Sequence, residues 1–141
     1  NQEKERENLL GYLKTVDWGA GKMLHKLISS NSAKDKLGKD SRIFYAMVQD
    51  QIICFFTLVN RDYIELSQYD RFIAMVWVDP DFRGRGLSRD FIAYAEEKSG
   101  VDTIHILTQH QGLYEKMGYK LIKIFTDSIH DRDYLYEKEL R

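Results

Sequence analysis

Hydrophobic residues recur at helical spacing in the first thirty positions of the chain. A helix over residues 3–16 is indicated by four apolar side chains on one face, namely Leu9, Leu10, Leu13 and Val16. A second helix follows Asp17, which is a suitable N-cap. Its apolar stripe comprises Ala20, Met23, Leu24, Leu27 and Ile28. Residues 31–40 are polar and predict a loop.

The middle of the chain carries continuous apolar runs, which are typical of strands with both faces buried. Residues 43–48 and 52–59 flank a short polar turn and predict a β-hairpin. Residues 72–78 predict a central strand, which Pro80 ends because proline has no N–H for the ladder.

A helix is expected from Leu87 to Ser99, before Gly100, with an inner face of Leu87, Phe91, Tyr94 and Ala95. Three further strands are expected at residues 103–107, 119–125 and 134–140, with a short helix at 112–116 that ends at Gly118. This order predicts an α/β chain with a mixed, mostly antiparallel sheet flanked by helices. No linker or repeat interrupts it, so we expect a single domain over residues 1–141.

Composition narrows the functional classes. The 141 residues carry a net charge of −1, which argues against a general nucleic-acid or membrane surface. There is one cysteine, Cys54, so no disulfide can form within the chain; with no visible signal peptide, we expect a cytoplasmic protein. His130, Asp131 and Asp133 share a polar turn but lack ordered ligand spacing, so no metal site is expected.

The turn after the central strand carries the clearest chemical signal. It reads Arg83-Gly84-Arg85-Gly86-Leu87-Ser88 and leads into a helix. Backbone N–H groups of such a turn converge on one point, and the helix dipole favours negative charge there. The glycines allow a ligand to approach the backbone, and the arginines add donors suited to phosphate. The turn therefore predicts a phosphate-binding site.

This turn resembles motif A of the GNAT N-acetyltransferases, and Ser88 stands where the family usually has Gly or Ala. Residues 108–119 resemble motif B, with the core Leu113-Tyr114-Glu115-Lys116-Met117-Gly118-Tyr119. The order of elements matches the GNAT fold over almost the whole chain, although the family's usual first strand is not evident. The resemblance implies a GNAT fold with splayed central strands and acetyl-CoA as co-substrate.

By the same resemblance, the amides of residues 83–88 hold the cofactor's pyrophosphate. The backbone of Val76 and Val78 pairs with the pantetheine arm and supplies the oxyanion donor. Thr108 stands near the place where many relatives have an asparagine that touches the cofactor, and its hydroxyl could substitute.

Acetyl transfer to an amine also needs an acid and a base. The resemblance makes Tyr114 the acid toward the CoA sulfur, with a packed helix tyrosine as the alternative. An alkylamine is almost fully protonated at neutral pH, so its proton must be removed before attack. The central strand has no carboxylate, which leaves Asp62 and then Glu65 as the nearest candidates, each with a solvated loop charge as the alternative. His110 is a further side chain that could line the site, and Cys54 is read as a buried, inert thiol.

The function predicted is acetyl transfer from acetyl-CoA to a primary amine of a small molecule or peptide by direct attack. The alternative is a GNAT-fold protein that binds CoA or another ligand as a sensor without turnover. The missing strand carboxylate and asparagine favour the sensor, whereas Tyr114 argues against it. A single Arg-Gly-Arg-Gly element in a chain of nearly neutral charge argues against RNA binding. A homodimer is an open option.

Overall fold

The computed structural model describes residues 2–61, 66, 68–126 and 132–141. Its first half contains the helices α1 (Gln2–Thr15), α2 (Gly19–Ser29) and α3 (Ala33–Leu37), followed by the strands β1 (Arg42–Val48), β2 (Gln51–Val59) and β3 (Phe72–Val78). Its second half contains the 3-10 turn η1 (Pro80–Phe82), α4 (Leu87–Lys98), β4 (Thr103–Thr108), the 3-10 turn η2 (Glu115–Met117), β5 (Lys120–Phe125) and β6 (Asp133–Glu139).

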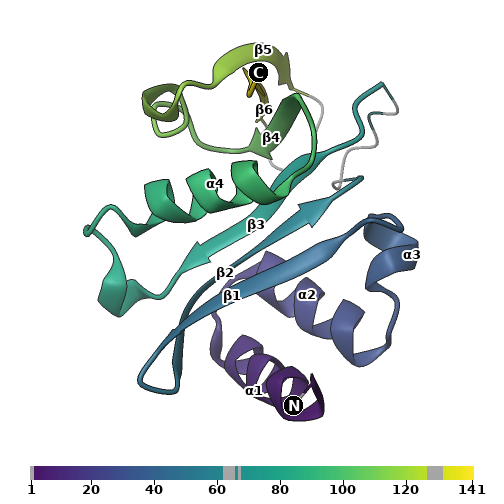
Figure 1. Ribbon diagram of the computed structural model, residues 1–141, viewed down its shortest axis with the longest axis vertical. Helices are drawn as coiled ribbons and strands as arrows, with labels where there is room; N and C mark the ends of the chain where they lie inside the picture. Colours follow the sequence, from purple (N-terminus) through teal and green to yellow (C-terminus); the bar gives the residue numbers. More distant parts are fainter. Residues whose placement is uncertain (1, 62–65, 67, 127–131) are drawn as a thin grey trace.

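The described strands form one six-stranded sheet in the order β1-β2-β3-β4-β6-β5 (Figure 1). Every neighbouring pair is antiparallel except β3 and β4, which run parallel and are connected through α4. The mixed, mostly antiparallel sheet with flanking helices confirms the predicted fold class.

Two apolar cores lie on opposite faces of the sheet. One joins α1, α2 and α3 to the sheet through side chains such as Leu13, Leu24 and Phe55. The other packs α4 against Phe56, Leu58 and other residues of the opposite face. Because β2 and β3 are covered on both sides, their sequences are apolar at nearly every position.

The predicted hairpin is confirmed, and its turn is tight. Val48 pairs with Gln51, which leaves Gln49 and Asp50 as the two turn residues. Both have positive φ angles, 49° and 68°, as two-residue turns between twisted strands often require. Glycine and asparagine are the usual residues in such turns, so the turn type could not be read from Gln49 and Asp50.

Three local expectations were wrong. Trp18, not Asp17, is the N-cap residue of α2, and no side chain caps that helix. The stretch 31–40 contains the short helix α3, whose Leu37 is buried in the first core. The helix expected at 112–116 is only the 3-10 turn at 115–117, although Gly118 does end it, with φ of 91°.

The inner face of α4 matches the expectation in part: Ala95 is buried and Phe91 packs, partly buried, against the second core. Ile92 and Ala95 are its buried residues, whereas Tyr94 is 41% exposed and meets Phe44 and Phe56 edge-on. Phe91 and Ile92 are adjacent apolar residues, so the helical pattern allows either to face inward. Packing against the sheet buries Ile92 fully and Phe91 only in part.

Candidate active site

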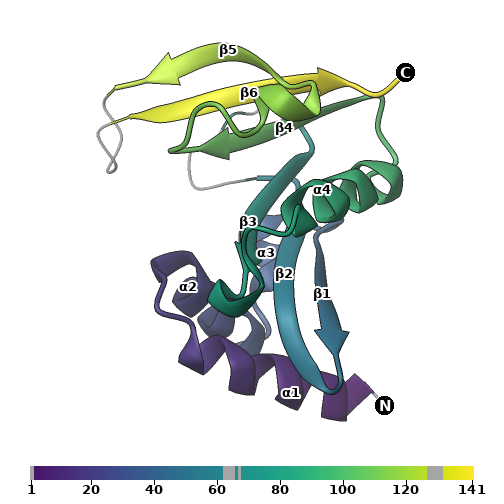
Figure 2. The ribbon, with the colours of Figure 1, turned by 90° about the vertical axis from the view of Figure 1, so that its left-hand side faces the viewer.

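The central strands β3 and β4 separate after a single pairing position. Phe72 pairs with His105, and the His105 amide donates to the Arg71 carbonyl at 3.1 Å. Beyond this point the strands diverge into an open angle (Figure 2). A first cavity of about 570 Å³ occupies the gap, between residues 73–76 of β3 and residues 106–108 of β4. The splay implied by the family resemblance is thus present.

A β-bulge shapes the β3 side of this gap. Trp77 pairs with Phe55 and Ala74 pairs with Thr57, so Met75 and Val76 together oppose Phe56. Met75 has φ of +54°, an uncommon conformation for a non-glycine residue and one often found at functional sites. The extra residue shifts the alternation of side chains, so Ala74 and Met75 both join the first core while Val76 packs against the second.

A second cavity of about 380 Å³ continues from the first along the end of β3. Four residues line both cavities: Trp18, Val76, His110 and Tyr114. The second cavity is further lined by Val78 and by the turn residues Arg83, Gly84, Gly86, Leu87 and Ser88. The candidate binding residues from two distant sequence motifs therefore meet around one continuous space.

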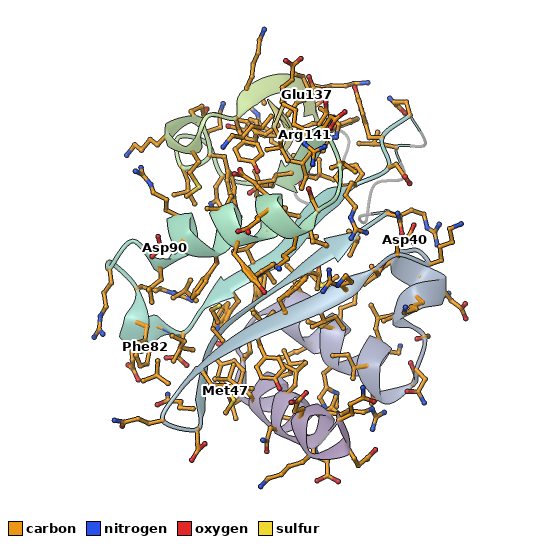
Figure 3. The ribbon with its side chains drawn as sticks, in the orientation of Figure 1. Asp40, Met47, Phe82, Asp90, Glu137 and Arg141 are labelled. Atoms are coloured by element: carbon orange, nitrogen blue, oxygen red, sulfur yellow. The ribbon has the colours of Figure 1, made fainter. Side chains whose placement is uncertain are left out.

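The glycine turn presents open backbone to the second cavity. Gly84 and Gly86 have φ angles of +80° and +74°, which non-glycine residues rarely adopt. A Cβ placed on either glycine would meet no other atom within 4 Å. Figure 3 labels Phe82, which precedes this turn, and Asp90, which follows it in the first turn of α4. Exposed glycine backbone therefore lies at the N-terminus of α4, a position where proteins commonly bind anions.

The side chains of the two arginines of the turn fold back onto the segments that precede it, β3 and η1. Arg83 donates from Nε to the Val78 carbonyl at 2.9 Å, and its guanidinium lies 4.7 Å from the Trp77 ring centroid. Arg85 donates to the Asp81 carbonyl at 3.4 Å and does not line either cavity. Both side chains already contact neighbouring groups of the protein. The backbone amides of the turn are therefore better candidates for phosphate contact than the two guanidinium groups.

A hydrogen-bonded group that the sequence did not reveal supports the cavity wall. The Tyr12 hydroxyl donates to Asp79 Oδ2 at 2.8 Å and accepts from Trp77 Nε1 at 3.0 Å. Burial, the main cause, raises the pKa of Tyr12 to about 12, so the hydroxyl stays protonated and can donate. Trp77 in turn stacks on Trp18, with ring centroids 5.5 Å apart. These contacts link α1 to the end of β3, 65 residues away in sequence.

Tyr114 lies where the two cavities meet. Its side chain is 7% exposed, and the rings of Tyr119 and Tyr136 lie 6.0 and 6.1 Å away. Burial raises the pKa of Tyr114 to about 12. The phenol is therefore neutral, and able to donate a proton, throughout the physiological range.

The candidate proton acceptors are two acidic residues and one histidine. Asp62 and Glu65 lie outside the described residues, and no aspartate or glutamate is among the described residues that line either cavity. His110 lines both cavities and is exposed. Thr108 lines the first, and its hydroxyl accepts the His110 amide at 3.2 Å.

Cys54 is buried in β2, with 1% exposure, and lines neither cavity. Burial raises the pKa of its thiol to about 12, which suppresses the nucleophilic thiolate.

Within the described part of the chain, no three His, Cys, Asp or Glu side chains are grouped as metal ligands. No helix of that same part is long and apolar enough to cross a membrane.

A family model for the acetyltransferase (GNAT) domain matches residues 39–121, more than half of the chain. The protein belongs to the GNAT acetyltransferase family, which confirms the resemblance seen in its two motifs. A search of curated protein sequences finds no significant match.

Solved structures show the same fold at low sequence identity. An aminoglycoside 6'-N-acetyltransferase from Enterococcus faecium is 15% identical, with a TM-score of 0.70 over 99% of this chain and 92% of that one. A spermidine N-acetyltransferase chimera of Vibrio cholerae SpeG and hSSAT is 16% identical, with a TM-score of 0.68 over 96% and 91%. An aminoglycoside 6'-N-acetyltransferase in complex with coenzyme A is 14% identical, with a TM-score of 0.66 over 96% and 91%.

Proposed function

We propose that this protein transfers an acetyl group from acetyl-CoA to the primary amine of a small molecule or peptide by direct attack. The observation that carries the proposal is the pair of joined cavities at the splay of β3 and β4. One opens onto the glycine turn, and the other reaches between the strands. Two substrates can thus enter from different sides and meet at Val76 and Tyr114.

In this proposal, acetyl-CoA runs along the second cavity. Its pyrophosphate takes the amides of the turn around Gly84 and Gly86, and its pantetheine arm follows the β3 edge at Val76 and Val78. The binding of coenzyme A by a structural neighbour supports acetyl-CoA as the co-substrate. The thioester then reaches the junction of the two cavities.

The reaction has three requirements at that junction. The amine nitrogen attacks the thioester carbon, and the developing oxyanion accepts a hydrogen bond from the Val76 amide at the bulge. The C–S bond then breaks, and Tyr114 gives its proton to the departing thiolate. The proton lost by the amine regenerates the phenol through solvent. Because the amine attacks the thioester directly, no covalent enzyme intermediate is needed.

From the sequence, we propose the base that accepts the amine proton. Asp62 or Glu65, acting through water, is the carboxylate assigned to it. His110 is the described basic side chain that lines both cavities, and it is the natural partner in such a relay. We further propose a single domain that acts in the cytoplasm.

The direct test is a screen for release of free CoA from acetyl-CoA with a panel of amines, antibiotics, polyamines and peptides. We expect at least one amine to be acetylated, with the product identified by mass spectrometry. Tight binding of CoA by calorimetry, with no acetylated product from a broad panel, would favour the sensor over the enzyme. Failure of CoA to bind at all would overturn the enzyme and the CoA sensor, and would leave only a sensor of another ligand.

A further inference from the structure

The walls of the first cavity are mostly apolar. From α2 and the residue before it come Trp18, Ala20 and Met23; β3 adds Ile73 and Met75, and β4 adds Leu107. Met23 is 41% exposed, which is unusual for a large apolar side chain and places it on an open part of the wall. The polar side chains of the lining are Thr108, Gln109, His110 and Tyr114.

Among the described residues, the lining of this cavity includes no negative charge. The one carboxylate proposed at the reacting amine, Asp62 or Glu65, lies outside the described residues and would serve a single amine. Asp17 is exposed beside Trp18 but does not line the cavity. Asp79, at the end of β3, already accepts the Tyr12 hydroxyl and the Asp81 amide. An ammonium group buried without a carboxylate partner is strongly disfavoured, and each additional ammonium repeats that cost.

We infer that the acceptor is an amine with a single charge on an apolar, aromatic-sized body, rather than a polyamine or an aminoglycoside. This inference rests on the proposed function, because it takes the first cavity as the acceptor side. Its volume of about 570 Å³ is ample for a one- or two-ring body. The inferred acceptor differs from those that appear in the names of the structural neighbours, aminoglycosides and spermidine.

The arrangement also orients such an acceptor. The polar lining residues come from the end of β4 and the segment after it, and two of them, His110 and Tyr114, also line the second cavity. The amine therefore points to the thioester, and the body packs between Trp18 and Met23. Trp18 is held in place by its stacking on Trp77, so its indole forms a rigid wall.

The test is calorimetric binding of three probe amines to the CoA-saturated protein: 2-phenylethylamine, spermidine and kanamycin. We expect 2-phenylethylamine to bind most tightly, and Trp18→Ala to weaken it by roughly 10–100-fold through loss of the aromatic wall. Tighter binding of spermidine or kanamycin by the wild-type protein would overturn the inference, as would an unchanged affinity in a folded Trp18→Ala variant.

A second variant avoids any dependence on the folding of Trp18→Ala. Met23→Glu adds a carboxylate to an exposed wall position and should shift the ratio of affinities toward spermidine by roughly 5–10-fold. The matched control is Met47→Glu, because Met47 is 38% exposed, lies on β1 and does not line the cavity (Figure 3). An equal response of both variants would place amine binding elsewhere and overturn the inference.

The inference and the proposed function fail in different ways. Preferential acetylation of spermidine or kanamycin would leave the enzyme intact and refute the acceptor class. Binding of 2-phenylethylamine that depends on Trp18, in a protein that neither binds CoA nor transfers acetyl, would refute the enzyme and show only that the first cavity binds this amine.

Discussion

At the scale of single residues, the proposal depends most on the phenol of Tyr114. Its burial keeps the hydroxyl protonated, and it lines both cavities, in which the two substrates are proposed to bind. Burial by itself is equally consistent with a tyrosine that only packs in the core. A kinetic measurement is therefore needed to separate the two roles.

Tyr114→Phe should lower kcat by roughly 10²–10⁴-fold with little change in KM, because proton donation acts mainly in the transition state. The ring and its packing on Tyr119 and Tyr136 are kept, so CoA affinity should hardly change. The deficit should shrink as pH rises, since a thiolate that is stable in solution needs less help. An unchanged kcat across the pH range would reduce Tyr114 to a packing residue.

Cys54 provides a contrasting residue-scale prediction. Its thiol is buried, with its pKa raised to about 12, and lies outside both cavities. Cys54→Ala should therefore keep most of the activity while losing some stability, roughly 1 kcal/mol or more from the buried cavity created. Loss of turnover in a folded variant that still binds CoA would argue for an acyl-enzyme.

Sequence reasoning was effective for residues that occur in a motif and weak for those that meet through the fold. The glycine turn and Tyr114 were found because their order along the chain carries the signal. Tyr12, Trp77 and Asp79 come from separate segments, and only the packing of α1 against the end of β3 brings them together. No local pattern could have predicted that contact.

At the scale of elements, the turn between β3 and α4 gives the sharpest structural prediction. Gly86→Val should abolish CoA binding, because it places a branched side chain in open space beside the proposed phosphate position. Calorimetry with CoA measures the effect.

Gly100→Val is the matched control. Gly100 has φ of +72°, almost the same as Gly86, and equally open surroundings, but it does not line either cavity. Both variants should lose a similar stability, roughly 1–3 kcal/mol for a strained φ, and only Gly86→Val should lose CoA. Equal CoA affinity in the two folded variants would show that the turn is not the phosphate site.

Elements were predicted more accurately than the relations between them. Apolar runs located β2 and β3, since strands covered on both faces need such runs. The separation of β3 from β4 and the bulge at Met75 depend on backbone geometry, and Met75 and Val76 look like ordinary strand residues. The cavity itself was therefore implied only by family resemblance.

At the scale of the whole molecule, several buried or half-buried phenols make the free energy of unfolding depend on pH. Burial, the largest cause in each case, raises the pKa of Tyr12, Tyr114 and Tyr136 to about 12. A pKa raised on folding gives stability that is complete below the unfolded value of 10 and is lost as pH rises toward 12.

We predict that urea unfolding midpoints are insensitive to these groups from pH 7 to about 10 and then fall steeply. Tyr114 alone accounts for roughly 2–3 kcal/mol of the loss by pH 12, from its pKa shift. Tyr114→Phe should show a correspondingly smaller alkaline loss than the wild-type protein. Equal alkaline losses in both proteins would mean that Tyr114 ionises freely in the folded state.

The central claim is that both substrates meet at the splay and react directly. Initial rates with acetyl-CoA and the best amine of the panel, each varied at several fixed concentrations of the other, test it most directly. We predict intersecting double-reciprocal lines, as a ternary complex requires, with Cys54→Ala giving the same pattern. Parallel lines, together with release of CoA before any amine is added, would contradict direct transfer.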